Sequence, residues 1–145
     1  MSLVQSTPAI SIVALPNSLG ARIYTLETDG LIREFCQDGV GKGWYTGLLD
    51  KKHQGSGSIS AVTYTDQAGA WCIEVYTIYA NRIQRWLWDS RSWTGGSTEN
   101  YGQDYVYASR NGNITHLVTR NPKVVVTYFI DEKGTWHPHD GPDLG

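Results

Sequence analysis

The chain places an arginine and a glutamate on two neighbouring segments that read as β-strands. Arg22 and Glu34 lie on either side of Asp29-Gly30, which is a strong hairpin signal. The same pairing returns further along the chain with the residue types exchanged, as Glu74 and Arg85. If the two members of a pair share a face of their hairpin, we expect a cross-strand ion pair. Such a pair offers charge-assisted hydrogen bonds to a polar ligand.

A unit of four short strands, repeated three times in 145 residues, would position these side chains. Asp38, Asp89 and Asp131 recur at intervals of 51 and 42 residues. The repeats predict units at about 9–50, 58–97 and 103–138, followed by a tail at 139–145. Four strands per period of about 40 to 50 residues are typical of propeller blades. We therefore predict an all-β protein, a β-propeller with three four-stranded antiparallel blades per chain. Because three blades do not close a ring, we expect self-association into a homodimer of three plus three blades.

The composition argues against several partners. The formal net charge is −2 and the chain has no segment rich in lysine and arginine, so we expect no nucleic-acid binding. The first twenty residues lack a basic segment followed by an apolar one, and we see neither a signal peptide nor a membrane span. We expect a soluble chain, cytoplasmic or exported by a route that the sequence does not show.

Cysteine and histidine usage gives no sign of a cofactor or metal. Cys36 and Cys72 sit in different units, and we expect two free, buried thiols. His137 and His139 flank a proline with Asp140 and Asp143 nearby, which invites a metal site. Their spacing lacks the order that ligation needs, so we favour a frayed tail. We therefore expect no cofactor and no metal.

The strands and turns of the first two units form a recognisable pattern. The first unit contains RIY from Arg22, IREFCQD from Ile32 and GWYTG from Gly43; the second contains IEVY from Ile73, IQRWLWD from Ile83 and SWTG from Ser92. This pattern resembles the blade of the Aleuria aurantia-type fucose-binding lectins, which form six-bladed propellers. It is also similar to their two-blade bacterial relatives, which trimerise into such rings. The likeness covers nearly the whole chain and is faint in the third unit.

The resemblance implies fucose-binding clefts between adjacent blades. In the first cleft, Arg22 and Glu34 would hold the sugar hydroxyls and ring oxygen, while Trp88 and Trp93 of the next blade would stack on its apolar side. Strand parity agrees, because Trp88 is three residues from Arg85 and so points to the opposite face, toward the preceding blade.

The other two clefts depart from the family pattern. In the second, Glu74 and Arg85 exchange places and face Ile130 and Trp136, so we expect an altered site formed by Glu74, Arg85 and Trp136.

We place Thr115 and Thr127 at the corresponding positions of the third unit, which leaves no charge there. Gln37 and Trp44 of a second copy would face this third cleft. We expect its sugar site to be lost.

Several functions remain open beside a lectin for fucose or fucosylated glycans. The sugar specificity could have changed, or the clefts could have decayed on a propeller that binds proteins. Arg22 and Glu34 could form an ordinary salt bridge, and Trp88 and Trp93 could simply pack between blades. An enzyme is disfavoured, because a glycosidase needs two carboxylates about 5 to 10 Å apart around one bond. Here each carboxylate is paired with an arginine instead.

Overall fold

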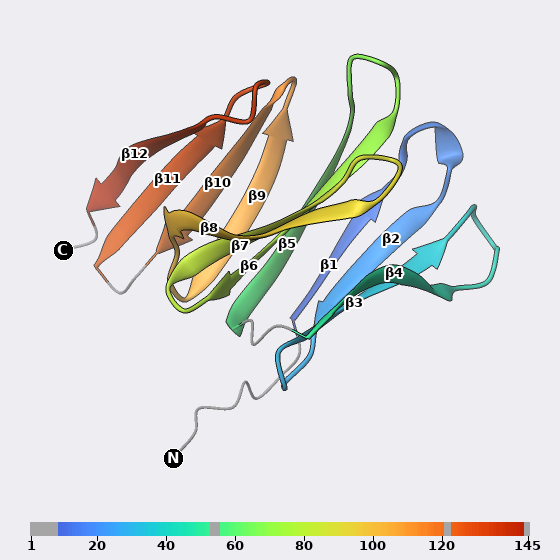
Figure 1. The fold of residues 1–145 in the computed structure, drawn as a ribbon, viewed down its shortest axis with the longest axis horizontal. Coiled ribbons are helices and arrows are strands. Elements are labelled where there is room, and N and C mark those ends of the chain that lie inside the picture. The colour runs from blue at the N-terminus through green and yellow to red at the C-terminus, as the bar shows by residue number, and fades with distance from the viewer. Residues whose placement is uncertain (1–8, 53–55, 121–122, 144–145) are drawn as a thin grey trace.

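The computed structural model describes residues 9–52, 56–120 and 123–143, which form three four-stranded antiparallel sheets (Figure 1). The predicted number of sheets and strands is confirmed. Blade 1 contains β1 (Ala9–Ala14), β2 (Ala21–Leu26), β3 (Leu31–Gln37) and β4 (Tyr45–Lys52), with a 3-10 turn at Pro16–Ser18. Blade 2 contains β5 (Ser56–Thr65), β6 (Trp71–Tyr79), β7 (Arg82–Trp88) and β8 (Trp93–Tyr101). Blade 3 contains β9 (Tyr105–Asn111), β10 (Ile114–Arg120), β11 (Val124–Ile130) and β12 (Trp136–Asp143).

The last strand corrects one expectation. β12 continues to Asp143 and pairs with β11 along its length, from Ile130 opposite Trp136 to Val124 opposite Asp143. Residues 139–143, expected as part of a tail, are therefore strand, because β11 offers them a free edge of backbone donors and acceptors. Residues 144 and 145 lie outside the described part of the chain.

Tight turns fix the register of the hairpins that carry the candidate residues. Ala80 and Asn81 both have positive φ, 52° and 61°, as a two-residue type I′ turn requires. This turn sets Tyr79 opposite Arg82, which in turn places Glu74 opposite Leu87. Since a shift of one residue would move every side chain to the other face of the sheet, this turn decides where Glu74 points.

Two apolar cores lie between neighbouring blades. Tyr24, Leu26 and Ile32 of blade 1 pack against Ile73 and Val75 of blade 2. Blades 2 and 3 enclose a second core, made of Val62, Tyr76, Ile78, Ile83, Val106, Leu117, Tyr128 and Ile130. Each blade thus uses one sheet face against its neighbour, and any site between blades is built at the edge of such a core.

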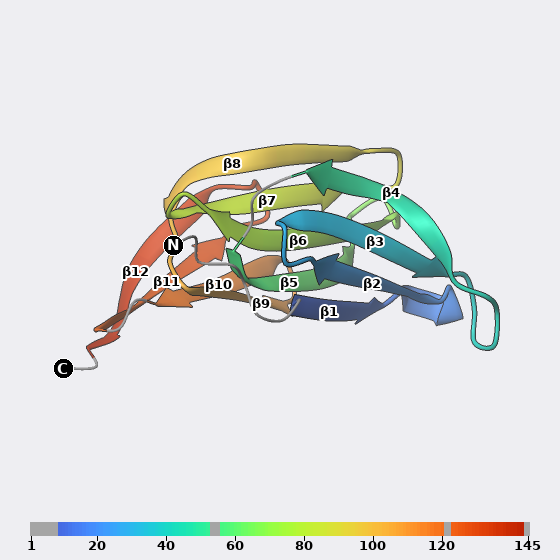
Figure 2. The ribbon, with the colours of Figure 1, turned by 90° about the horizontal axis from the view of Figure 1, so that it is seen from below.

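The first strands of the blades, β1, β5 and β9, run beside one another along the lower side of Figure 2. The Ser11 hydroxyl of blade 1 accepts a hydrogen bond from the Ala61 amide of blade 2 at 3.1 Å. Ser60 of blade 2 accepts one from the Ala108 amide of blade 3 at 2.9 Å. The repetition of this contact gives a structural alignment of the three blades.

Both cysteines are free and buried, as predicted. Burial, reinforced by the nearby Glu34 carboxylate, raises the pKa of the Cys36 thiol to about 11. Within the described chain, no helix has the length and apolar character needed to cross a membrane.

Candidate binding clefts between the blades

The first predicted cleft corresponds to the junction of blades 1 and 2, where blade 1 presents Arg22 and Glu34. Both point toward blade 2 and are nearly buried, at 8% and 5% exposure. They are diagonal neighbours: Arg22 lies opposite Cys36, whereas Glu34 lies opposite Tyr24. The two side chains therefore share a face of the hairpin, which is the condition for a cross-strand ion pair.

The predicted ion pair between Arg22 and Glu34 is wrong. Arg22 Nη2 lies 3.1 Å from Asp38 Oδ1 instead, and Nη1 donates to the carbonyl oxygens of Ala21 and Gln37. The reason is the diagonal register, which brings the guanidinium to the end of β3, where Asp38 follows.

Glu34 is held by other partners. Oε2 accepts a hydrogen bond from the Tyr24 hydroxyl at 2.7 Å, and Oε1 accepts from the amides of Leu48 and Leu49 at 3.0 and 3.4 Å. The carboxylate occupies space left by Gly47, where an added Cβ would lie 2.0 Å from Oε1. Glu34 is therefore a fixed acceptor in the wall of the cleft.

Asp38 is a candidate that sequence reasoning used only to mark the repeat. Its side chain is about half exposed, and its two oxygens bind Arg22 and the Tyr45 hydroxyl, the latter at 2.7 Å. The hydrogen bond from Tyr45 and the charge of Arg22 hold the pKa of Asp38 below its usual range. The same hydrogen bond raises the pKa of Tyr45 to about 12. The rim of the first cleft thus presents an ionised carboxylate and a protonated phenol.

The facing wall, from blade 2, is aromatic. Trp88 and Trp93 have ring centroids 5.7 Å apart, and Trp71 lies 6.0 Å from Trp88. Trp93 meets the edge of Tyr24 at 5.9 Å, and the guanidinium of Arg22 lies 5.6 Å from the Trp71 ring. Trp88 and Trp93 therefore face blade 1 as predicted. Trp71 was missed, because it precedes the motif that marks the strand.

The second cleft lies between blades 2 and 3, and here the predicted ion pair forms. Arg85 binds Glu74 Oε2 through Nε, at 3.1 Å, and through Nη2. Arg85 Nε also donates to the Tyr76 hydroxyl at 3.2 Å. Arg85 occupies the position in blade 2 that Glu34 has in blade 1. Because the arginine side chain is longer, it contacts its diagonal neighbour Glu74, whereas Glu34 does not contact Arg22.

Blade 3 adds two further partners that sequence reasoning did not assign to this cleft. The Thr115 hydroxyl donates to Glu74 Oε1 at 2.7 Å, and Arg110 Nη1 donates to that hydroxyl at 2.9 Å. The Arg110 guanidinium also covers the Tyr64 ring at 3.6 Å. Arg110 carried no signal in the repeat, because the aligned residues of the other blades are Thr63 and Ala14.

A cavity of about 580 Å³ opens beside this network and is lined by Glu74, Arg85 and Arg110 among others. Trp136, expected to stack on a ligand here, meets the ring edges of Tyr76 and Tyr128 at 6.4 and 5.6 Å. It packs against the apolar core and is absent from the lining of this cavity. The second cleft is consequently polar and charged where the first is aromatic.

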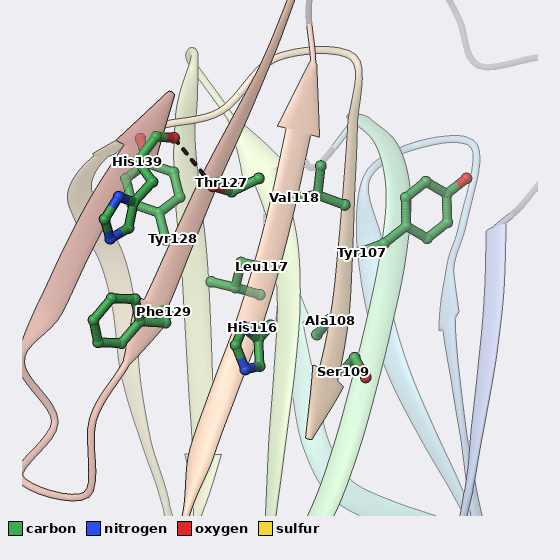
Figure 3. Close-up of a pocket in the computed structure, with 10 residues that line it drawn as sticks. All are labelled: Tyr107, Ala108, Ser109, His116, Leu117, Val118, Thr127, Tyr128, Phe129 and His139. Atoms are coloured by element: carbon green, nitrogen blue, oxygen red, sulfur yellow. Dashed lines mark hydrogen bonds between the residues drawn. The ribbon is translucent and has the colours of Figure 1, made fainter. Parts of the chain in front are cut away.

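The third unit departs further from the sequence alignment. Phe129 pairs with His116, so His116, and not Thr115, corresponds to Arg22 and Glu74. The error of one residue reverses the face, which is why Thr115 points back into the second cleft. Thr127 has the predicted place and donates to the His139 carbonyl at 3.1 Å (Figure 3). The outward face of blade 3 holds a hollow of about 440 Å³ along these residues.

His137 and His139 lie on β12 and not on a frayed tail. Their rings stack with Phe129 at 4.4 and 5.5 Å, and His137 Nε2 lies 2.9 Å from Asp131 Oδ2. Among the described residues, no three histidine, cysteine or acidic side chains gather as a metal site would require. The side chains of Asp140 and Asp143 are not among those described.

Comparison with known proteins gives the family. Residues 5–134 match the family model described as fungal fucose-specific lectin. The chain belongs to this lectin family. A lectin binds carbohydrate without chemical change, so this member is a non-catalytic protein. A search of curated proteins found no match.

Solved structures establish the fold of this fungal-type lectin. It is similar to a fucose lectin from Kordia zhangzhouensis in complex with methyl-fucoside, with a TM-score of 0.70 and 22% identity over 90% of this chain and 97% of that one. SapL1 lectin, in complex with α-methyl fucoside, matches with a TM-score of 0.71 and 17% identity. The match covers 95% of this chain and 50% of the SapL1 chain. The Aleuria aurantia lectin, a six-bladed β-propeller, matches with a TM-score of 0.75 and 20% identity. The match covers 94% of this chain and 45% of the Aleuria aurantia chain. The lectin described here thus spans about half the length of the latter two chains, and its predicted propeller fold is confirmed.

Proposed function

We propose that this lectin binds fucose and fucosylated glycans in the cleft between blades 1 and 2. The observation that carries the proposal is the pairing of a polar wall, with Arg22 and Glu34, and an aromatic wall, with Trp88 and Trp93. A pyranose needs both, since its hydroxyls seek donors and acceptors while its C–H face seeks an apolar surface. The relatives solved with methyl-fucoside support the choice of sugar.

The polar groups of the first cleft suit this task because they are already ordered. Arg22 is fixed by Asp38, and Glu34 is fixed by Tyr24 and the β4 amides. A fixed site loses little side-chain entropy on binding. Charge-assisted hydrogen bonds of roughly 1.5–3 kcal/mol each, less the cost of association, give a single-site affinity in the micromolar to millimolar range, on the order of −4 to −8 kcal/mol.

Titration calorimetry with methyl α-L-fucoside tests the proposal. Arg22→Lys keeps the charge but loses the planar fork, and Glu34→Gln keeps the shape but loses the charge. Each should weaken binding at least about tenfold, which corresponds to about 1.4 kcal/mol. Thr127→Ala, at the aligned position of blade 3, is the control and should bind as wild type does. Unchanged affinity in both variants would overturn the proposed site.

If the folded wild-type protein shows no binding of methyl α-L-fucoside in calorimetry, the proposal of fucose binding itself is overturned. A screen of immobilised glycans on the same sample then separates the two remaining functions. Binding to another sugar class would indicate changed specificity, and no glycan binding would favour a protein-interaction propeller.

We further infer that a second copy of the chain completes the ring. Ile10 of β1 aligns with Ile59 and Val106, which are buried at 4% and 0% exposure in the two cores. Ile10 itself is 67% exposed, and Ile12, which aligns with Ala61, is 63% exposed. The open face of blade 1 therefore has the pattern of a core face without its neighbour.

Blade 3 offers a matching surface. Its open face carries Tyr105 and Tyr107, whose rings stack at 6.4 Å and are about half exposed. If the open face of blade 1 from a second copy packed against this surface, the contact would repeat the packing of blade 2 on blade 1 and of blade 3 on blade 2. The joint would also bring Trp44 of the second copy beside His116 and Thr127.

The mass in solution tests this assembly. Analytical ultracentrifugation should give twice the mass of one chain. Ile12→Asp places a charge at the centre of the joint and should yield monomers. Val40→Asp, on a loop side chain that is 96% exposed, is the control and should leave the mass unchanged. A wild-type monomer at micromolar concentration would contradict the inference.

A further inference from the structure

The second cleft holds more positive than negative charge in its buried part. Glu74 is approached from one side by Arg85, with Nε 3.1 Å from Oε2, and from the other by Arg110, with Nη1 3.9 Å from Oε1. One carboxylate thus lies between two guanidinium groups that come from different blades. Together these three groups carry a net charge of +1.

This charge is poorly hydrated. The side chains of Glu74, Arg85 and Arg110 are 1%, 23% and 18% exposed. Burying charge is costly unless a counter-charge is close by, so the excess favours an anion beside the two arginines. Glu74 is hidden behind them and already accepts from Arg85 and Thr115. The surface offered to a ligand is therefore made of guanidinium N–H donors.

Other charged groups line the same cavity nearer its rim. Asp66 Oδ1 accepts from the amides of Ala68 and Ala70, and Asp131 Oδ1 accepts from those of Lys133 and Thr135. These two carboxylates bind their own turns.

Glu132 and Lys133 add one charge of each sign to this rim. A ligand with many negative charges would meet repulsion from the three rim carboxylates. A ligand with a single carboxylate can place that group beyond the rim, beside the guanidinium donors of Arg85 and Arg110.

We propose that the second cleft binds an acidic pyranose, a sugar that carries a single carboxylate. Its carboxylate bridges Arg85 and Arg110, which present planar forks suited to such a group. The cavity of about 580 Å³ falls within the range of roughly 300–1,000 Å³ found for small-molecule sites. Asn113, whose Nδ2 donates to Glu132 at 3.4 Å, also lines the cavity and offers an amide group to ring hydroxyls. The exchange of Glu and Arg relative to blade 1 thus gives this lectin a second specificity.

Matched sugars isolate the carboxylate. Methyl β-D-glucuronide and methyl β-D-glucoside differ only at C6, where one has a carboxylate and the other a hydroxymethyl group; methyl α-D-galacturonide and methyl α-D-galactoside form a second such pair. In calorimetry, at least one uronide should bind about tenfold tighter than its neutral partner. Equal affinities within both pairs would overturn the proposal.

Arg110→Gln tests the geometry, since it leaves the ion pair of Glu74 with Arg85 in place. It should weaken uronide binding at least about tenfold in a protein that circular dichroism shows to be folded. Arg91→Gln removes the same charge from an exposed turn and should have no effect. If both variants weaken binding equally, general charge and not this cleft is responsible, and the proposal fails. Methyl fucoside, titrated separately, reports on the first cleft, so the two sites can fail independently.

Discussion

The Tyr24 hydroxyl donates a hydrogen bond to Glu34 across β2 and β3, with 2.7 Å between the hydroxyl and Oε2. Both side chains are buried, at 0% and 5% exposure, so water does not readily replace either partner. Burial, together with the charge of Glu34, raises the pKa of Tyr24 far above its ordinary value of 10.0. Tyr24 therefore remains a protonated donor through the neutral range and fixes the orientation of the Glu34 carboxylate.

Tyr24→Phe should lower the free energy of unfolding by about 1–3 kcal/mol, because it removes a donor from a buried carboxylate. Glu34 would keep its two backbone donors, so the fold should survive. Urea denaturation of the variant and of the wild type measures the change. Equal stability of Tyr24→Phe and wild type would show that the hydroxyl contributes nothing net.

Gly47→Ala should displace Glu34 from its place. The new Cβ would lie 2.0 Å from Oε1, so either the carboxylate or β4 has to move. Overpacking of this kind costs about 1–3 kcal/mol of stability, and we expect fucoside binding to weaken at least about tenfold. Gly43→Ala is a close control, because no heavy atom outside its chain neighbours lies within 4 Å of the added Cβ. Fucoside binding that survives Gly47→Ala unchanged would separate Glu34 from the sugar.

The stability of the protein should fall at alkaline pH, in part through Cys36. The unfolded thiol loses its proton above pH 9.0, whereas the buried thiol keeps it up to about pH 11. Between these values the unfolded state binds fewer protons than the folded state, so the free energy of unfolding decreases as pH rises. Urea titrations at pH 8, 9 and 10 measure this slope, and Cys36→Ala should make it shallower. An unchanged slope would mean that the thiol titrates alike in both states.

Periodicity predicted the fold well, because each blade repeats the same burial constraint. The aspartates after β3, β7 and β11 mark equivalent corners, and four strands per repeat leave few alternatives to a propeller. Trp88 was also placed on the correct face by strand parity alone. Such inferences depend only on alternation along one strand, which the sequence carries directly.

Contacts between strands were harder to predict, since they depend on register and side-chain reach. Arg22 and Glu34 share a face, yet they are offset diagonally. Arg22 therefore hydrogen-bonds Asp38, and Glu34 accepts a hydrogen bond from Tyr24. In the third unit, one residue of error exchanged His116 for Thr115 and moved the site to the wrong face.

Contacts between blades were harder still. Arg110 approaches Glu74 from another sheet, and no sequence feature near Glu74 predicts this contact.

Thr115→Val should expose the importance of this contact between blades. The hydroxyl donates to Glu74 Oε1 and accepts from Arg110 Nη1, so it links both charges. Valine has nearly the same shape but leaves both groups without this partner, and we expect a loss of about 1–3 kcal/mol in the free energy of unfolding. Thr115→Ser keeps the hydroxyl and should lose less. If serine and valine destabilise the protein equally, packing of the threonine methyl, and not the link between Glu74 and Arg110, holds blade 3 against blade 2.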